Sequence, residues 1–83
     1  MDKQWTVYIL RCGDDTLYTG ITNDLPARLE AHRTGKGAKY TRGRGPLELL
    51  YSENCADKSE ALKRECAIKA LRREDKINLI ATR

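Results

Sequence analysis

Two runs of β-prone residues near the start of the chain, 5–10 and 16–21, are separated by a Gly-Asp-Asp cluster at 13–15. Glycine and aspartate tolerate the backbone angles of a tight turn, so this stretch predicts a β-hairpin. Tyr8 and Tyr18 lie at similar distances from the turn, which makes them cross-strand or diagonal neighbours. Whether they share a face depends on the strand register, which the sequence leaves open.

Length and composition predict one small domain spanning residues 1–83, with 40% apolar and 34% charged residues. No apolar run approaches the roughly 18 residues of a membrane span, and the first residues lack the pattern of a signal peptide. We therefore expect a cytoplasmic protein without a membrane partner. Cys12, Cys55 and Cys66 show no CxxC spacing and His32 is the sole histidine, which argues against a disulfide framework and a zinc module. We expect all three cysteines to be buried or half-buried.

Positive charge is concentrated in one segment of a chain whose net charge is +4. Residues 28–44 contain six arginines and lysines against one acid, Glu30, and four of the six glycines lie between residues 35 and 45. A glycine-rich basic loop that includes an aromatic side chain suits contact with a nucleic-acid backbone and base stacking. The alternative is a solubilising surface without a specific partner. The candidate nucleic-acid-binding residues are Lys36, Lys39, Tyr40, Arg42 and Arg44.

A helix is predicted between the hairpin and the basic loop, over residues 27–33, with its N-cap at 23 or 24 and its end at Gly35. Arg28 and His32 are four residues apart, so they project together from one side of this helix. A solvated arginine and a histidine that interacts with the helix dipole are the structural alternatives to a functional pair.

Three more elements follow the loop. Residues 47–52 predict a strand that is apolar enough to pack on both faces, and residues 54–57 predict a turn. Asp57 followed by Glu60 resembles a capping box, which begins a helix over about residues 59–71. A short final helix around Ile77, Leu79 and Ile80 is expected to close the core.

Glu65 is the unusual residue of the second helix. At roughly 100° per residue it falls in the middle of an arc of smaller or apolar residues. A carboxylate directed at a core is costly unless it is paired or binds a metal. Two interpretations remain open, an ion pair with Lys69 or an arginine, and a hard oxygen ligand for Mg²⁺. The arc consists of Ala61, Leu62, Cys66 and Ile68.

The motif Thr6-Val7-Tyr8, nine intervening residues and Tyr18-Thr19-Gly20 resembles the signature of the GIY-YIG nuclease superfamily. The resemblance covers about residues 4–80, and the chain is most similar to the short stand-alone bacterial proteins of that superfamily. It implies an α+β fold in which helices flank a small three-stranded, mostly antiparallel sheet, in the order β-β-α-β-α-α. The family's catalytic arginine, its following histidine and its metal-binding glutamate match Arg28, His32 and Glu65. Asn78 is the candidate for a late asparagine that many relatives carry.

The resemblance implies a metal-dependent nuclease that hydrolyses phosphodiester bonds, with DNA as its expected partner and no obligate protein partner. Tyr8 would be the general base, Arg28 a clamp on the scissile phosphate, and Tyr18 and His32 would orient groups or relay protons. Glu65 would hold one divalent ion, Mg²⁺ or Mn²⁺, and Gly20 would allow close packing at the strand end. A nucleic-acid-binding module without turnover and a protein–protein adaptor are the alternatives.

Overall fold

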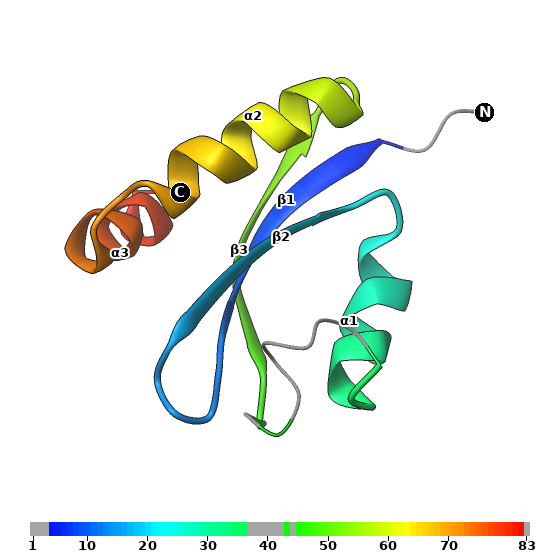
Figure 1. Ribbon diagram of the computed structural model, residues 1–83, viewed down its shortest axis with the longest axis vertical. Helices are drawn as coiled ribbons and strands as arrows, with labels where there is room; N and C mark the ends of the chain where they lie inside the picture. The colour runs from blue at the N-terminus through cyan, green and yellow to red at the C-terminus, as the bar shows by residue number, and fades with distance from the viewer. Residues whose placement is uncertain (1–3, 37–42, 44, 83) are drawn as a thin grey trace.

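The chain has the predicted order of elements, three strands and three helices in the order β-β-α-β-α-α (Figure 1). The computed structural model describes residues 4–36, 43 and 45–82. The elements are β1 (Trp5–Arg11), β2 (Leu17–Thr22), α1 (Leu25–Arg33), β3 (Glu48–Cys55), α2 (Lys58–Lys69) and α3 (Arg73–Ala81).

The three strands form one antiparallel sheet in the order β2-β1-β3. Tyr8 of β1 lies opposite Gly20 of β2, and Leu10 lies opposite Tyr18. Because side chains alternate along each strand, this register makes Tyr8 and Tyr18 diagonal neighbours on the same face. The structure thus answers the question of register that the sequence left open.

Helices cover both faces of the sheet. Figure 1 shows α1 on one side and α2 with α3 on the other. Val7 and Ile9 belong to a core cluster with Ala61 and Ile68 of α2. The opposite face of β1 carries Tyr8, which meets α1. The central strand therefore has a continuous run of buried residues.

The prediction that the third strand packs on both faces is wrong. Leu49 of β3 is 40% exposed, and the strand covered on both faces is β1. β3 lies at an edge of the sheet, where the covering helices reach it only in part. The expected turn at 54–57 is also shorter, because β3 continues to Cys55 to pair with Trp5.

Side chains at the predicted positions cap the first two helices. Asp24 accepts a hydrogen bond from the backbone N–H of Ala27 at 3.3 Å, and Asp57 accepts one from Glu60 at 2.8 Å. Gly35 follows α1 with φ of 80°, a conformation that glycine adopts without strain. The predicted caps are confirmed, although α2 ends at Lys69, two residues earlier than expected.

The cysteines and the last helix complete the core only in part. Cys12 and Cys55 are buried, but Cys66 is exposed on α2, so the expectation that all three are covered is wrong for Cys66. Leu79 and Ile80 of α3 pack against the core as expected. Within the described residues, no helix has the length and apolar character that crossing a bilayer requires.

Candidate active site

The centre of the candidate site is the hydroxyl of Tyr8, which lies between two residues of α1. Its oxygen is 2.8 Å from Nε2 of His32, and Nε of Arg28 donates to it at 3.4 Å. Tyr8 has no exposed surface and His32 is 3% exposed. Because one turn of α1 separates Arg28 from His32, a single helix brings both groups to the same hydroxyl.

Three rings pack together around this hydroxyl. The ring centroids of Tyr8 and Tyr18 are 6.3 Å apart, those of Tyr8 and His32 are 5.7 Å apart, and those of Tyr18 and His32 are 5.4 Å apart. His32 meets both tyrosines edge-on, a favourable arrangement for aromatic pairs. The tyrosines of the two motif halves and the helical histidine therefore form one cluster.

Gly20 provides the space that the Tyr8 ring occupies. A Cβ atom at this position would lie 2.7 Å from the Tyr8 hydroxyl, 2.9 Å from its Cζ and 3.0 Å from Cε1 of Tyr18. The first two distances are shorter than real Cβ atoms show, and the third is tighter than most Cβ contacts. The motif glycine is thus needed for the close approach of two rings to the β2 backbone.

Burial and charge perturb the pKa values of the cluster. Burial raises the pKa of Tyr8 above 10.0, and this effect outweighs the hydrogen bond and charge of Arg28, which lower it. Burial, followed by the charge of Arg28, lowers the pKa of His32 below 6.5. The hydrogen bond to Tyr8 raises the pKa of Arg28. At neutral pH the site therefore combines a protonated tyrosine, a neutral histidine and a cationic arginine.

The protonation states give the hydrogen bonds a direction. Arg28 donates to the Tyr8 oxygen, so the hydroxyl proton is available to His32. A neutral imidazole has one acceptor nitrogen, and its tautomer follows from its partners. We assign Nε2 as the acceptor of the Tyr8 proton.

Glu65 belongs to α2, on the other face of the sheet, yet its charge reaches the cluster. Burial is the main cause of the raised pKa of Tyr8, and the Glu65 carboxylate is the smallest of the contributions that raise it. Its side chain is 20% exposed, and Oε2 is 3.4 Å from Nζ of Lys69. The ion pair considered from the sequence is thus present, at the border of the site.

The predicted arc around Glu65 is rotated in the structure. Ala61 and Ile68 are buried, but Leu62 is 46% exposed and Cys66 is also exposed. The buried side of α2 is therefore centred between Ala61 and Ile68, and Glu65 lies at its margin. The helical periodicity of the sequence predicts that these five residues share one side of α2, but it does not predict which half of that side packs against the sheet.

Glu65 is a single carboxylate ligand, so the residues here suit only a weakly bound metal ion. Within the described residues, no three histidine, cysteine, aspartate or glutamate side chains are grouped as a metal site. Mg²⁺ keeps several waters and commonly takes one or two carboxylates together with substrate phosphates. A single partly exposed carboxylate is compatible with that chemistry.

The remaining predicted residues are not brought to this cluster by any described contact. Lys36 is exposed after α1, whereas Lys39, Tyr40, Arg42 and Arg44 lie outside the described residues. Asn78 is exposed on α3. Sequence reasoning did not select Lys76, which lines a pocket with Tyr18 and Lys69. Lys76 belongs to no sequence motif, and its position beside Tyr18 depends on how α3 packs against the rest of the fold.

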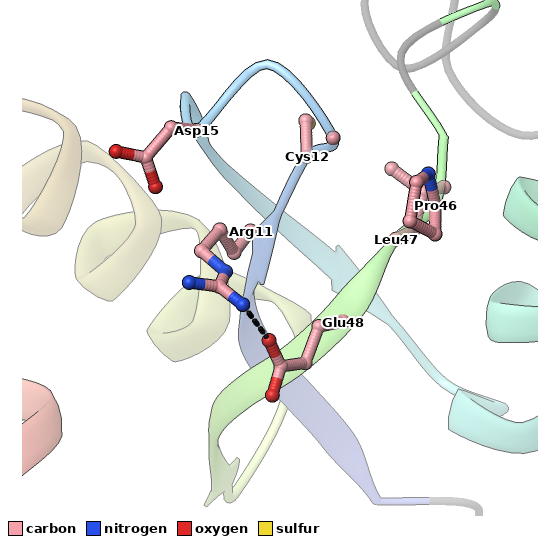
Figure 2. A pocket seen from close by; sticks show the side chains of 7 residues that line it. Arg11, Cys12, Asp15, Pro46, Leu47 and Glu48 are labelled. Atoms are coloured by element: carbon pink, nitrogen blue, oxygen red, sulfur yellow. Dashed lines mark hydrogen bonds and ion pairs between the residues drawn. The ribbon is translucent and has the colours of Figure 1, made fainter.

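A separate pocket of about 290 Å³ lies at the tip of the hairpin, as Figure 2 shows. Cys12 and Pro46 are part of its wall, and Arg11 forms an ion pair with Glu48 at 2.7 Å beside it. Neither Tyr8 nor Arg28 lines this pocket. It therefore adds no group to the cluster described above.

Comparison with known proteins gives matches over nearly the whole chain. The profile of the GIY-YIG catalytic domain matches residues 4–78. A UPF0213 protein of Oceanobacillus iheyensis is 60% identical over 80 residues, which cover 96% of this chain and 93% of the relative. A UPF0213 protein of Staphylococcus aureus is 52% identical over 83 residues, which cover 100% of both chains.

Two solved structures have the same fold. The solution NMR structure of a UPF0213 protein from Bacillus halodurans is 44% identical and has a TM-score of 0.64, over 96% of this chain and 85% of that chain. The solution NMR structure of a protein from E. faecalis is 37% identical and has a TM-score of 0.68, over 99% of this chain and 90% of that chain.

Proposed function

The chain belongs to the GIY-YIG superfamily of nuclease catalytic domains, and from that membership we propose that it is a metal-dependent endonuclease that hydrolyses phosphodiester bonds in DNA. The observation that carries the proposal is the contact of the Tyr8 hydroxyl with both His32 and Arg28. An acceptor for a proton, a cation for a phosphate and a carboxylate for a metal are what this hydrolysis needs.

Arg28 binds the scissile phosphate. The residue is half-buried and its guanidinium is always charged, and planar guanidinium groups bind phosphate oxygens through two parallel hydrogen bonds. The hydrogen bond from Arg28 to Tyr8 is long, at 3.4 Å, so it is easily exchanged for a stronger one to an anion. Moving Arg28 toward the phosphate also uncovers the Tyr8 hydroxyl, which has no exposed surface in the free protein.

Tyr8 and His32 then act together as the base. A water gives a proton to the Tyr8 oxygen while the Tyr8 proton passes to Nε2 of His32. The water oxygen forms a bond to phosphorus, and the bond to the leaving sugar oxygen breaks, with its electron pair going to that oxygen, which takes a proton from solvent. The neutral state of His32, which its lowered pKa maintains, is what makes it an acceptor.

Glu65 would hold the divalent ion, which supplies charge neutralisation at the phosphate when it is bound. Tyr18 packs on both Tyr8 and His32 and keeps the two rings aligned. Gly20 keeps the β2 backbone out of the space of the Tyr8 ring. These three residues thus support a reaction in which Arg28 contacts the substrate, Tyr8 contacts the reacting water and His32 accepts the Tyr8 proton.

A nucleic-acid-binding module without turnover is the second candidate. The observations that favour it are the covered Tyr8 hydroxyl and the ion pair that engages Glu65. Both features would have to change before catalysis. An ion pair of this kind is weak at a partly exposed site, so a divalent ion and a phosphate together can displace it.

The test compares cleavage of labelled DNA and RNA substrates, including flaps and branched duplexes, with Mg²⁺ and with Mn²⁺. Glu65→Gln removes the carboxylate, and the matched control Glu74→Gln removes an exposed one from α3. We expect cleavage by the wild type and by Glu74→Gln, and none by Glu65→Gln, which still binds the substrate. Binding without cleavage by the wild type under every metal condition would support the second candidate instead.

A further inference from the structure

A pocket of about 340 Å³ lies against β2, and we call it the β2-edge pocket. β2 is an outer strand of the sheet, so one of its sides has no strand partner among the described residues. The described residues that line the pocket are Leu17, Tyr18, Thr19, Lys69 and Lys76. They come from β2, from the end of α2 and from the first turns of α3, so the pocket exists only where these three elements meet.

The lining of the β2-edge pocket is cationic. It contains two lysines, and the described residues that line it include no carboxylate. The nearest acid that contacts either lysine in the described part of the chain is Glu65, at 3.4 Å from Lys69. A concave site with two ammonium groups suits an anion that carries several oxygens.

Backbone donors of β2 add to this chemistry. The N–H of Cys12 donates to the carbonyl of Thr16 at 2.8 Å, and bonded and non-bonded pairs alternate along an antiparallel ladder. Continuing that alternation along the β1–β2 pairs directs the N–H groups of Leu17 and Thr19 away from β1, toward the open edge. Both residues line the pocket, so their amides can serve an anion there.

Thr19 also has a hydroxyl that lacks a partner. It is 3% exposed, and its Oγ1 makes no hydrogen bond to any described residue. A buried hydroxyl without a partner lowers the stability of the folded state, so such groups are uncommon in folded proteins. An oxygen-rich ligand in the pocket, with the flexible lysine side chains rearranged around it, would satisfy this group.

An ion pair holds Lys76 near β2. Arg73 begins α3 and lies 3.3 Å from the carboxylate of Asp15 in the hairpin turn. Lys76 follows one turn later, on the helix that this contact draws toward the hairpin. The pair is largely exposed, so it orients α3 without adding much stability.

We propose that the β2-edge pocket binds a backbone phosphate of the nucleic-acid strand, adjacent to the phosphate that Arg28 holds. The proposal rests on the proposed function for the position of the scissile phosphate. Two residues connect the sites, because Tyr18 packs on Tyr8 and His32, and Lys69 pairs with Glu65. A strand that crosses the edge of β2 thus meets Lys76 and Arg28 in succession.

The experiment measures affinity for a labelled oligonucleotide in EDTA, where no metal-dependent cleavage takes place, at several salt concentrations. Lys76→Gln removes one charge from the pocket, and the control Lys63→Gln removes one from an exposed position on α2. We expect Lys76→Gln to bind about three- to tenfold more weakly and to lower the salt slope by about 0.9 on duplex DNA or 0.7 on a single strand. Lys63→Gln is expected to bind like the wild type.

Amide chemical shifts provide a second measurement on the same proteins. We expect the Leu17 and Thr19 amides of the wild type to shift on titration with the oligonucleotide, and those of Lys76→Gln to need about three- to tenfold more oligonucleotide for the same shift. Equal affinity and salt slope for the two lysine variants, or Leu17 and Thr19 amides that do not respond while His32 does, would overturn the proposal. Equal shifts with inorganic phosphate at the same phosphate concentration would assign the pocket to a free anion and overturn binding of a strand.

The outcomes for this pocket and for the nuclease are separable. Cleavage by the wild type with no difference between Lys76→Gln and Lys63→Gln refutes the pocket and leaves the nuclease intact. A specific loss of binding in Lys76→Gln without any cleavage by the wild type supports the pocket and refutes the nuclease.

Discussion

Replacing Gly20 with alanine tests whether the β2 backbone must approach the Tyr8 ring as closely as the structure shows. The new Cβ would lie 2.7 Å from the Tyr8 hydroxyl and 2.9 Å from Cζ. Overpacking of this kind costs about 1–3 kcal/mol. Alanine in a strand recovers about 0.5–1 kcal/mol of the backbone entropy that glycine loses. We therefore expect a net loss of about 1 kcal/mol in the free energy of unfolding.

The assay is thermal unfolding followed by circular dichroism. For a domain of this size the loss corresponds to a melting temperature lower by about 4–8 °C. Gly45→Ala is the control, because a Cβ at Gly45 meets no atom within 4 Å. Since the displaced ring carries the hydroxyl bound to His32, we also expect DNA cleavage by Gly20→Ala to fall by roughly tenfold or more.

A double-mutant cycle identifies the clash. Tyr8→Phe removes the oxygen that a Cβ at Gly20 would approach most closely. In that background Gly20→Ala should cost about 0.5 kcal/mol less, because residues in contact have coupled effects. A Gly20→Ala protein with the melting temperature of the wild type and unchanged His32 ring signals would refute the packing argument.

Three further predictions concern single side chains. For His32, the folded-state pKa lies below the ordinary value of 6.5, so between the two pKa values the unfolded chain binds more protons than the folded one. The free energy of unfolding therefore rises with pH and levels off above about 6.5. Urea unfolding between pH 4.5 and 7.5 should show a shallower rise for His32→Gln than for the wild type, and equal slopes would contradict the burial argument. Arg64 makes two hydrogen bonds to Glu53, at 3.0 and 2.9 Å, with side chains that are 39% and 27% exposed. Because solvent weakens a pair of this exposure, Arg64→Met should lose only about 1 kcal/mol of stability while retaining DNA affinity, and a loss of affinity would assign Arg64 to the interface. Tyr8→Phe removes the hydroxyl that contacts the buried Nε2 of His32, so the free energy of unfolding should fall by about 1 kcal/mol. The cleavage rate should fall by about 10²- to 10⁴-fold, and full activity would exclude Tyr8 as part of the base.

Local rules in the sequence were sufficient to predict the elements and their caps. Asp24 and Asp57 cap helices where a short polar side chain precedes an apolar pattern, and Gly35 follows α1 with positive φ. Arg28 and His32 are one helical turn apart, so they project from the same side of α1, and both contact the Tyr8 hydroxyl. These predictions succeeded because each depends on residues within a few positions of one another.

Predictions that depend on packing between distant elements failed or stayed open. The register that unites Tyr8 with Tyr18 requires the pairing of two strands, and the rotation of Glu65 to the margin of the core requires the docking of α2. The exposed Cys66 follows from that same rotation. The raised pKa of Tyr8 could not be predicted either, because its largest cause is the burial that the assembled fold produces.

The position of β2 at the edge of the sheet explains how groups from opposite faces can act on one substrate. Tyr8 points from the central strand β1 toward α1, whereas Glu65 extends from α2 on the other face of the sheet. A substrate can therefore meet both side chains only at an edge of the sheet. Because no described strand lies outside β2, Lys69 reaches the pocket beside Tyr18, and the part of α2 that carries Glu65 lies close to that edge. Open edges usually invite pairing with other chains, and short strands and nearby lysines reduce that risk. β2 has only six residues, and lysines lie beside it. The charges that would bind a nucleic-acid strand therefore also hinder a strand of another chain from pairing with β2 and covering the site.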